Sequence, residues 1–191
     1  MSEHKQERPY PASLSFLLNN PIRRWLQPPS ELLDKLEIKS TDVVIDFGCG
    51  PGYYTFEIAK RAKQVIAVDI SNEMLTKVQT KATKTNVKNI QFVQSDGKNI
   101  QIGDQAVDML LLVTVYHEVH DHKVVLKEFN RILKSESKLT IVEVVKESRF
   151  PGAPVQDSDA LKAEIEGSGF FKLEKTIPYK RYAVFVFAKN I

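Results

Sequence analysis

The sequence predicts an α/β fold of Rossmann-like type: a three-layer sandwich around a seven-stranded mixed sheet, with five parallel strands and a C-terminal antiparallel hairpin. Short apolar runs alternate with amphipathic helical runs between residues 43 and 145. The apolar runs are almost continuous, which is typical of parallel strands that are covered on both faces. Two more strand-like runs then follow each other at the C-terminus with two residues between them. These three observations define the fold class.

Each expected parallel strand is a short apolar run rich in β-branched residues; the five runs are 43–48, 65–70, 90–96, 107–115 and 139–145. Three amphipathic runs lie between them and are expected to be helices over 53–63, 72–85 and 122–134. In the last of these, Val125, Phe129 and Ile132 recur at the spacing of one helical face. Before the first strand, Ser30 is expected to cap a helix over 31–38, because its hydroxyl can accept a hydrogen bond from a free amide of the first turn.

The C-terminal part is expected to fold as a helix followed by a hairpin. The helix covers 159–170 and is closed by Gly167 or Gly169. The runs 170–179 and 182–190 are strands, and a parallel pair would need a crossover of about a dozen residues between them. The two strands are therefore antiparallel.

The size and composition are those of one globular domain spanning residues 1–191, with 42% hydrophobic and 27% charged residues. Residues 1–30 are expected to be a proline-rich leader or lid, and 31–191 a cofactor-binding core. No apolar run approaches the roughly 20 residues of a membrane-spanning helix, so no membrane partner is expected. The single cysteine, Cys49, excludes an internal disulfide, and the polar N-terminus has no signal-peptide core; both favour a cytoplasmic protein.

Three glycines, Gly48, Gly50 and Gly52, stand in one turn between the first strand and the next helix. Glycine lets backbone approach a ligand closely, because a Cβ would collide with it. At the carboxyl edge of such a sheet, free helix amides also point into the ligand crevice. Asp69 ends the second strand, 21 residues after Gly48, where its carboxylate can accept hydrogen bonds from two ribose hydroxyls. Together these features predict a pocket for a nucleoside-bearing cofactor.

The segment Asp46-Phe47-Gly48-Cys49-Gly50-Pro51-Gly52 resembles motif I of the class I S-adenosylmethionine-dependent methyltransferases, commonly hD-x-G-x-G-x-G. The dinucleotide fingerprint G-x-G-x-x-G is a poorer match, because Tyr53 stands where its third glycine belongs. Asp69 matches the family's ribose-binding acid, and Asp96, after the third strand, matches the acid that contacts the adenine amino group. The segment 129–143 resembles the family's R-x-L-K-P-G-G-x-L stretch, with Ser135-Glu136-Ser137 in place of Pro-Gly-Gly.

This resemblance implies S-adenosylmethionine as cofactor and S-adenosylhomocysteine as product. The implied cofactor site draws on the turn, the ends of the next strands and the leader: Asp46, Gly48, Cys49, Gly50, Gly52, Asp69, Ile70, Asp96, Gly97, Thr114 and Tyr10. The leader has two interpretations. It is either a lid, with Tyr10 or an arginine meeting the cofactor carboxylate or an anionic substrate, or a helix packed on the domain with its arginines in solvent.

The loop after the fourth strand carries most of the chemically active side chains: Tyr116, His117, Glu118, His120, Asp121 and His122. His117 or Glu118 is the candidate general base, which is needed only if the nucleophile arrives protonated. We expect no metal, because H-E-x-H lacks the spacing that places two histidines on one helical face. The other interpretation makes Asp121 a helix cap and His120 a loop residue. Glu143 either lies near the crevice or holds a backbone amide.

The resemblance implies a transferase that moves a methyl group to a small-molecule acceptor by in-line displacement, as a monomer or homodimer. The alternatives are an enzyme that methylates RNA or protein, and a regulatory protein that binds S-adenosylmethionine or S-adenosylhomocysteine without turnover. A lysine stripe at helical spacing would suit RNA: Lys77, Lys81, Lys84 and Lys88. We favour a solvated helix face, because no aromatic residue is interleaved to stack bases and the net charge is only +3.

Overall fold

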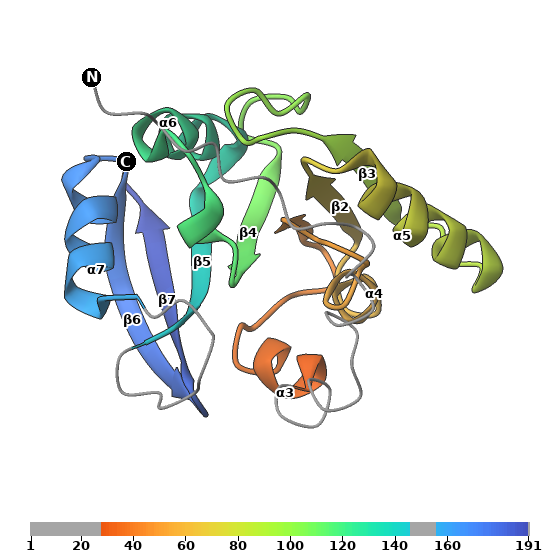
Figure 1. Ribbon diagram of the computed structural model, residues 1–191, viewed down its shortest axis with the longest axis horizontal. Helices are drawn as coiled ribbons and strands as arrows, with labels where there is room; N and C mark the ends of the chain where they lie inside the picture. The colour runs from red at the N-terminus through yellow and green to blue at the C-terminus, as the bar shows by residue number, and fades with distance from the viewer. Residues whose placement is uncertain (1–27, 146–155, 191) are drawn as a thin grey trace, which may run out of the picture.

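The computed structural model describes residues 28–145 and 156–190, and Figure 1 shows the arrangement of their helices and strands. The strands are β1 (Val43–Phe47), β2 (Gln64–Asp69), β3 (Ile90–Gln94), β4 (Val107–Val113), β5 (Leu133–Val144), β6 (Phe171–Tyr179) and β7 (Tyr182–Lys189). The helices are α3 (Pro29–Leu33), α4 (Thr55–Ala59), α5 (Asn72–Lys84), α6 (His122–Ile132), α7 (Ser158–Gly167) and the short 3₁₀ helix η2 (Tyr116–Glu118).

The seven strands of the described residues form one sheet with the order β3-β2-β1-β4-β5-β7-β6. Neighbouring strands from β3 to β5 are parallel, whereas β7 pairs antiparallel with both β5 and β6. The predicted fold class is therefore confirmed, including the five parallel strands and the C-terminal hairpin. The extent of the domain over 1–191 stays a prediction, because part of the leader lies outside the described residues.

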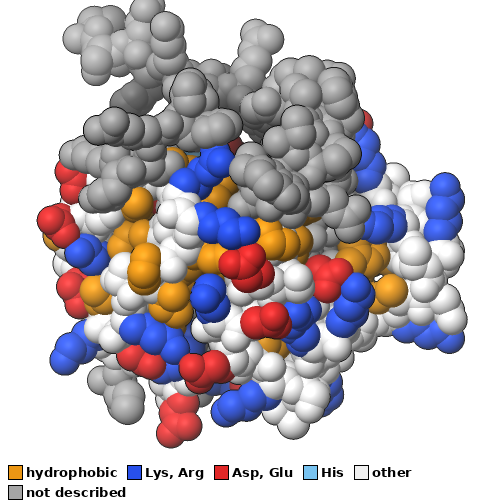
Figure 2. All heavy atoms as spheres, turned by 90° about the horizontal axis from the view of Figure 1, so that it is seen from below, with side chains coloured by type: hydrophobic (Ala, Val, Ile, Leu, Met, Phe, Trp, Pro, Cys, Tyr) orange, Lys and Arg blue, Asp and Glu red, His pale blue; other side chains and the backbone are white. Residues whose placement is uncertain are grey.

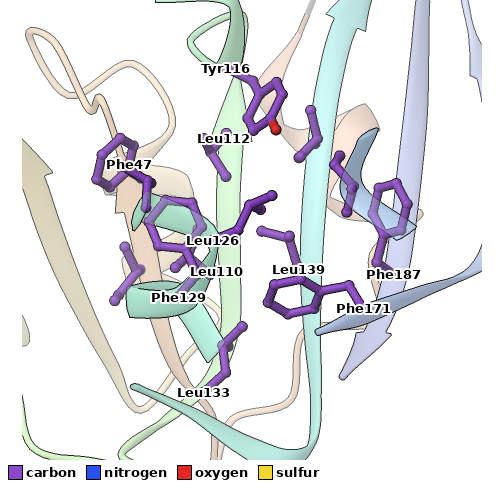
Figure 3. Packing of buried hydrophobic residues seen from close by; sticks show 14 of the residues in the cluster. Phe47, Leu110, Leu112, Tyr116, Leu126, Phe129, Leu133, Leu139, Phe171 and Phe187 are labelled. Carbon is purple, nitrogen blue, oxygen red and sulfur yellow. The ribbon is translucent and has the colours of Figure 1, made fainter. Parts of the chain in front are cut away.

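Alternate residues of each strand face two different helical layers. In β2, Val65 and Ala67 pack on the side of α3, α4 and α5, whereas Ile66 and Val68 pack on the side of α6 and α7. Figure 3 shows the core on the α6 side, in which Phe129 of α6 lies close to Phe47 of β1. Because side chains alternate with a period of two, both faces of the sheet are buried.

The first helix begins differently from the prediction. Pro29 is its first residue, Pro28 occupies the N-cap position, and no side chain caps the helix. The expected cap by Ser30 is therefore wrong. Proline is favoured at the first helical position because it has no amide hydrogen that would need a partner.

Two other elements differ in length from the prediction. Helix α4 has only five residues, Thr55–Ala59, because the residues before it are used by the glycine turn. Strand β5 begins at Leu133, directly after α6. Leu133 pairs with Val107 while Lys138 pairs with Met109, so the residues between them bulge out of register. The Ser135-Glu136-Ser137 segment thus lies within an irregular strand and not in a separate turn.

The carboxyl ends of β1 to β5 lie at one edge of the sheet, because parallel strands share one direction. From β1 the chain proceeds outward to β2 and β3, and it then returns to place β4 on the other side of β1. Ligand crevices of open α/β sheets form at such a change of direction. None of the helices within 28–145 and 156–190 is long and apolar enough to cross a membrane.

Replacing Phe129 by Ala is expected to lower the free energy of unfolding by about 3–5 kcal/mol, because it leaves a cavity in the core. Phe129 is fully buried, and its ring meets that of Phe47 edge-on with 5.1 Å between centroids. Urea unfolding measures the change. Val124→Ala on the same helix is the control, since Val124 is 48% exposed and should cost about 0.5 kcal/mol or less. Equal losses for the two variants would contradict this packing.

Candidate functional site

The glycine turn after β1 is attached to the end of β2 by three hydrogen bonds. The amides of Gly48 and Cys49 donate to the Val68 carbonyl at 2.8 and 3.0 Å. The Gly50 amide donates to Asp69 Oδ2 at 2.8 Å. The turn and the acid at the end of the next strand are therefore one structural unit.

The three glycines of the turn differ in how much space surrounds the position of a Cβ. All have positive φ, at +68° for Gly48, +51° for Gly50 and +82° for Gly52. A Cβ at Gly48 would lie 2.5 Å from a methyl group of Val115, and one at Gly52 would lie 2.9 Å from the Phe56 ring. A Cβ at Gly50 meets no described atom within 4 Å. Packing within the protein therefore explains Gly48 and Gly52, and Gly50 is the position in the turn where a ligand could approach the backbone closely.

Asp69 and Ile70 give this edge of the sheet a carboxylate and an apolar surface. Asp69 Oδ1 accepts from the Ser71 amide at 2.8 Å, so each oxygen of this carboxylate accepts from at least one backbone amide. Burial raises the pKa of Asp69, and the hydrogen bonds from the Ser71 and Gly50 amides oppose the rise. Ile70 follows with 53% of its surface exposed, which is uncommon for so large an apolar side chain next to a buried strand.

The loop after β3 reaches the same edge. The Ser95 amide donates to the Asp69 carbonyl at 3.1 Å, which places the loop beside the end of β2. Asp96 is exposed, and its Oδ1 accepts from the Lys98 amide at 3.1 Å. Gly97 is buried with φ of +92°, and a Cβ there would lie 2.9 Å from the Phe47 ring. Packing against the core is therefore sufficient to explain Gly97.

Asp46 lies beneath the turn and is almost completely buried. Thr55 Oγ1, at the start of α4, donates to Asp46 Oδ2 at 2.6 Å. Burial raises the pKa of Asp46 to about 6, partly offset by the Thr55 hydrogen bond. Burial also raises the pKa of the Cys49 thiol, with the nearby charges of Asp46 and Asp69 adding to the rise. The thiol is therefore an unreactive packing group.

The loop after β4 packs against the glycine turn. Thr114 adopts a left-handed conformation with φ of +56°, and its amide donates to the Val142 carbonyl at 2.8 Å. Val115 then places its methyl groups over Gly48. A left-handed conformation is unusual for a β-branched residue, and such strain is concentrated at functional sites.

His117, in η2, contacts a fully buried carboxylate. Its Nδ1 lies 3.2 and 3.1 Å from the two carboxylate oxygens of Glu143 on β5. Glu143 is 0% exposed, whereas the Glu118 side chain is 57% exposed and its Oε1 lies 3.8 Å from His117 Nε2. The alternatives left open for Glu143 are thus resolved: its carboxylate faces an imidazole at the carboxyl edge, and the described contacts include no backbone amide.

The other histidines of this loop have separate surroundings. His122 begins α6, pairs through Nδ1 with Glu164 of α7 and stacks on Tyr116 with 4.4 Å between ring centroids. Within 28–145 and 156–190 no three acidic, histidine or cysteine side chains form a group that could hold a metal ion. Asp121 occupies the N-cap position of α6 without a side-chain cap and pairs with Lys98 at 2.5 Å, so its expected capping role is wrong.

The two opposite edges of the sheet each carry a hollow. One of about 130 Å³ borders the loop after β4 and is lined by residues that include Tyr116, His117 and Glu164. The other, of about 430 Å³, lies near the starts of β1 and β4 and is lined by residues that include Asp108 and Lys134. Lys134 Nζ and Asp108 Oδ1 are 2.7 Å apart, so these charges satisfy each other. The smaller hollow is the one beside the candidate site.

The structure brings the predicted cofactor residues of the described chain to the carboxyl edge of the sheet: Asp46, Gly48, Cys49, Gly50, Gly52, Asp69, Ile70, Asp96, Gly97 and Thr114. Tyr10 and the rest of the predicted lid in 1–27 lie outside the described residues, as does the segment 146–155 after β5, which we expect from the sequence to form a rim of the site. Sequence reasoning missed Thr55 and the pairing of Glu143 with His117. A signal for Glu143 was present, since it is the one acid in the otherwise apolar run that begins at Leu139.

The fold and this edge of the sheet define a class of protein. The family described as "Methyltransferase domain" matches residues 38–182 of the chain. The chain therefore belongs to the methyltransferase-domain family, and its fold is that of the class I S-adenosylmethionine-dependent methyltransferases.

Three known proteins illustrate the similarity. The crystal structure of an S-adenosylmethionine-dependent methyltransferase from Aquifex aeolicus is 26% identical, with a TM-score of 0.84, over 95% of this chain and 100% of that chain. The demethylmenaquinone methyltransferase of Lactobacillus johnsonii is 34% identical over 57% of this chain and 46% of its own length. A 23S rRNA (uracil(1939)-C(5))-methyltransferase of Haemophilus influenzae is 35% identical over 46% of this chain and 22% of its own length. The chain spans about half or less of these two curated relatives.

Asp46→Asn is expected to remove part of the pH dependence of stability. With a pKa of about 6 against the ordinary 3.8, folded Asp46 keeps its proton where the unfolded chain has lost it. Its contribution to the free energy of unfolding is therefore complete below pH 4 and is lost as the pH rises to about 6. The loss amounts to up to about 3 kcal/mol. Urea unfolding from pH 4 to 7 measures it.

Asp104→Asn is the control for this measurement, because the Asp104 side chain is 75% exposed. The control should retain the fall in stability between pH 4 and 6. The same fall in Asp46→Asn as in the wild type would contradict the assignment to Asp46.

Proposed function

We propose that this chain binds S-adenosylmethionine across the glycine turn and transfers its methyl group to a small-molecule acceptor beside the loop after β4. The observation that carries the proposal is the open space at Gly50, whose amide donates to Asp69 while a Cβ at this position would meet no described atom within 4 Å. Such a backbone approach is what a ligand lying on the turn requires.

The residues around the turn suit the parts of this cofactor. The Asp69 carboxylate has about four acceptor sites, which three backbone amides do not fill, so it can still accept a hydrogen bond from a ribose hydroxyl. Ile70 offers an exposed apolar side chain for the adenine ring, and the exposed Asp96 carboxylate suits the adenine amino group. The cofactor supplies an activated methyl group on a sulfonium, so the protein has mainly to orient the acceptor in line and exclude water.

The charge distribution favours a small acceptor over RNA. Figure 2 views the end toward which β4 runs, and on its coloured part basic side chains are interspersed with acidic ones. Helix α5 begins beside Asp69 and runs away from this end, so Lys84 lies roughly 18 Å along the axis from Asn72. Lys77 pairs with Glu73 at 3.0 Å, and Lys81 lies 4.1 Å from the centre of the Phe56 ring. Two of the four lysines of the stripe therefore contact neighbours on the protein surface.

RNA stays the second candidate, because one similar protein is named a 23S rRNA methyltransferase. A binding-only regulatory role has less support, since it would not need a buried carboxylate beside His117. The cytoplasmic location and the monomeric or homodimeric state stay predictions.

Gly50→Asn tests the placement of the cofactor. Asn tolerates positive φ better than other non-glycine residues, and no described atom opposes its Cβ, so the fold should survive at a cost of about 1–2 kcal/mol. The side chain would occupy the ligand's place, and the dissociation constant for S-adenosylmethionine should rise at least about tenfold in calorimetric titration. Gly48→Asn is the contrast, because its clash with Val115 should lower stability first. If Gly50→Asn binds S-adenosylmethionine as tightly as the wild type does, the cofactor does not lie on the glycine turn.

Asp69→Asn should weaken binding of S-adenosylmethionine by about 1–3 kcal/mol, because the amide lacks the charge and one of the two acceptor atoms. Titration with S-adenosylmethionine, S-adenosylhomocysteine and NAD measures the effect and the cofactor preference together. Asp104→Asn, at an exposed acid, should bind like the wild type. Preference for NAD, or equal affinities of the two variants, would refute the proposal.

A further inference from the structure

Glu143 is an acid at a core position of its strand. Along β5, Leu139 and Ile141 face the layer of α6 and α7, and Glu143 follows at the same spacing of two. Its side chain is 0% exposed. Burying an ionised carboxylate is strongly unfavourable unless a partner compensates for its lost hydration. Glu143 therefore depends on whatever faces it.

The group that faces it is the imidazole of His117. Nδ1 lies 3.2 Å from Oε1 and 3.1 Å from Oε2, and nearly equal distances fit an N–H directed between the two oxygens of an ionised carboxylate. A neutral imidazole with its hydrogen on Nδ1 carries a lone pair on Nε2. Glu143 thus selects the tautomer in which Nε2 can accept a proton.

The loop that carries His117 contacts the glycine turn through Val115, and His117 itself lines a hollow. Val115, two residues earlier, covers Gly48, so the loop lies against the turn proposed to bind the cofactor. The imidazole also lines the hollow of about 130 Å³ beside Tyr116 and Glu164. Ligand pockets commonly measure about 300–1,000 Å³, so this hollow suits a small acceptor or the reacting end of a larger one.

We propose that His117 Nε2 takes the proton of the methyl acceptor and that Glu143 is the positioning residue that holds His117 in this tautomer. The proposal rests on the function proposed above. As the acceptor atom bonds to the methyl carbon and the carbon–sulfur electron pair stays on sulfur, Nε2 receives the acceptor's proton. The buried negative charge of Glu143 stabilises the imidazolium that results. The acceptor class is therefore one whose reacting atom carries a proton: a hydroxyl, a thiol or an amine.

This geometry also favours one of the two candidate general bases, His117 and Glu118, between which the sequence does not choose. Glu118 is 57% exposed, and water competes for an exposed carboxylate. His117 is 16% exposed and is oriented by a buried partner. His117 is the proton acceptor, and Glu118 lies at the rim.

The tautomer of His117 is the direct test. The chain has four histidines, so ¹⁵N-labelled histidine gives few signals, and His117→Asn assigns the relevant ones. Two-bond ¹H–¹⁵N spectra at pH 8.5, with and without S-adenosylhomocysteine, should show hydrogen on Nδ1 and none on Nε2. Glu143→Gln should introduce the tautomer with hydrogen on Nε2. Glu136→Gln, the same change at an exposed position of β5, should leave the spectrum unchanged.

Hydrogen on Nε2 of the wild-type protein at this pH overturns the proposal, as does a Glu143→Gln spectrum identical to the wild type. Should Glu143→Gln fail to fold, the wild-type spectrum alone decides. The tautomer of His117 can be measured without any methyl transfer. An unexpected tautomer would therefore refute the role of His117, whereas a failure of S-adenosylmethionine to bind would refute the proposed function.

Transfer from methyl-labelled S-adenosylmethionine to a panel of phenols, thiols, primary amines, thioethers and tertiary amines tests the acceptor class. The protic members should be methylated about 10–100-fold more slowly by Glu143→Gln than by the wild type, with cofactor affinity within about threefold. Methylation of an aprotic member at equal rates by both proteins overturns the proposal. No transfer to any member counts against the proposed function.

Discussion

The hydrogen bond from the Gly50 amide to Asp69 Oδ2, 2.8 Å long, joins the turn after β1 to the end of β2. The other carboxylate oxygen holds the Ser71 amide at the start of α5, so one side chain organises both segments. Val115 closes the turn from the side of β4. Because the ends of three strands hold the turn, its backbone geometry does not require a ligand to form it, which reduces the cost of ordering on binding.

The buried carboxylates of the described residues lie where the strands end. Asp46, Asp69 and Glu143 are all buried in the carboxyl half of the sheet, and each has a hydrogen-bonding partner there. Apolar residues at these positions would pack at lower cost, because a buried carboxylate loses its hydration. Such costs accumulate where groups are arranged for chemistry. The opposite ends of the same strands show the ordinary pattern of paired surface charges.

The fold by itself does not decide what is methylated. Proteins with partial sequence similarity to this chain are named for different substrates, demethylmenaquinone and 23S rRNA. The differences that choose an acceptor lie in the loops and in the charges at the carboxyl edge. In this chain the edge carries a loop with the left-handed Thr114, and α5 runs away from it; their part in the choice of acceptor belongs to the function proposed above.

The strands and helices along the chain, the C-terminal hairpin, the glycine turn and the acid at the end of β2 could all be predicted from the sequence. The spacing of apolar residues, the length of connections and the positions of glycines are local properties of the chain, so they predict these features from the sequence alone. Two features required the three-dimensional structure. Val115 and Phe56 leave no room for a Cβ at Gly48 and Gly52, and Glu143 contacts His117, which is 26 residues away in the sequence. Those contacts exist because β4 pairs with β5 and particular side chains share one face of the sheet, and no local pattern contains that information.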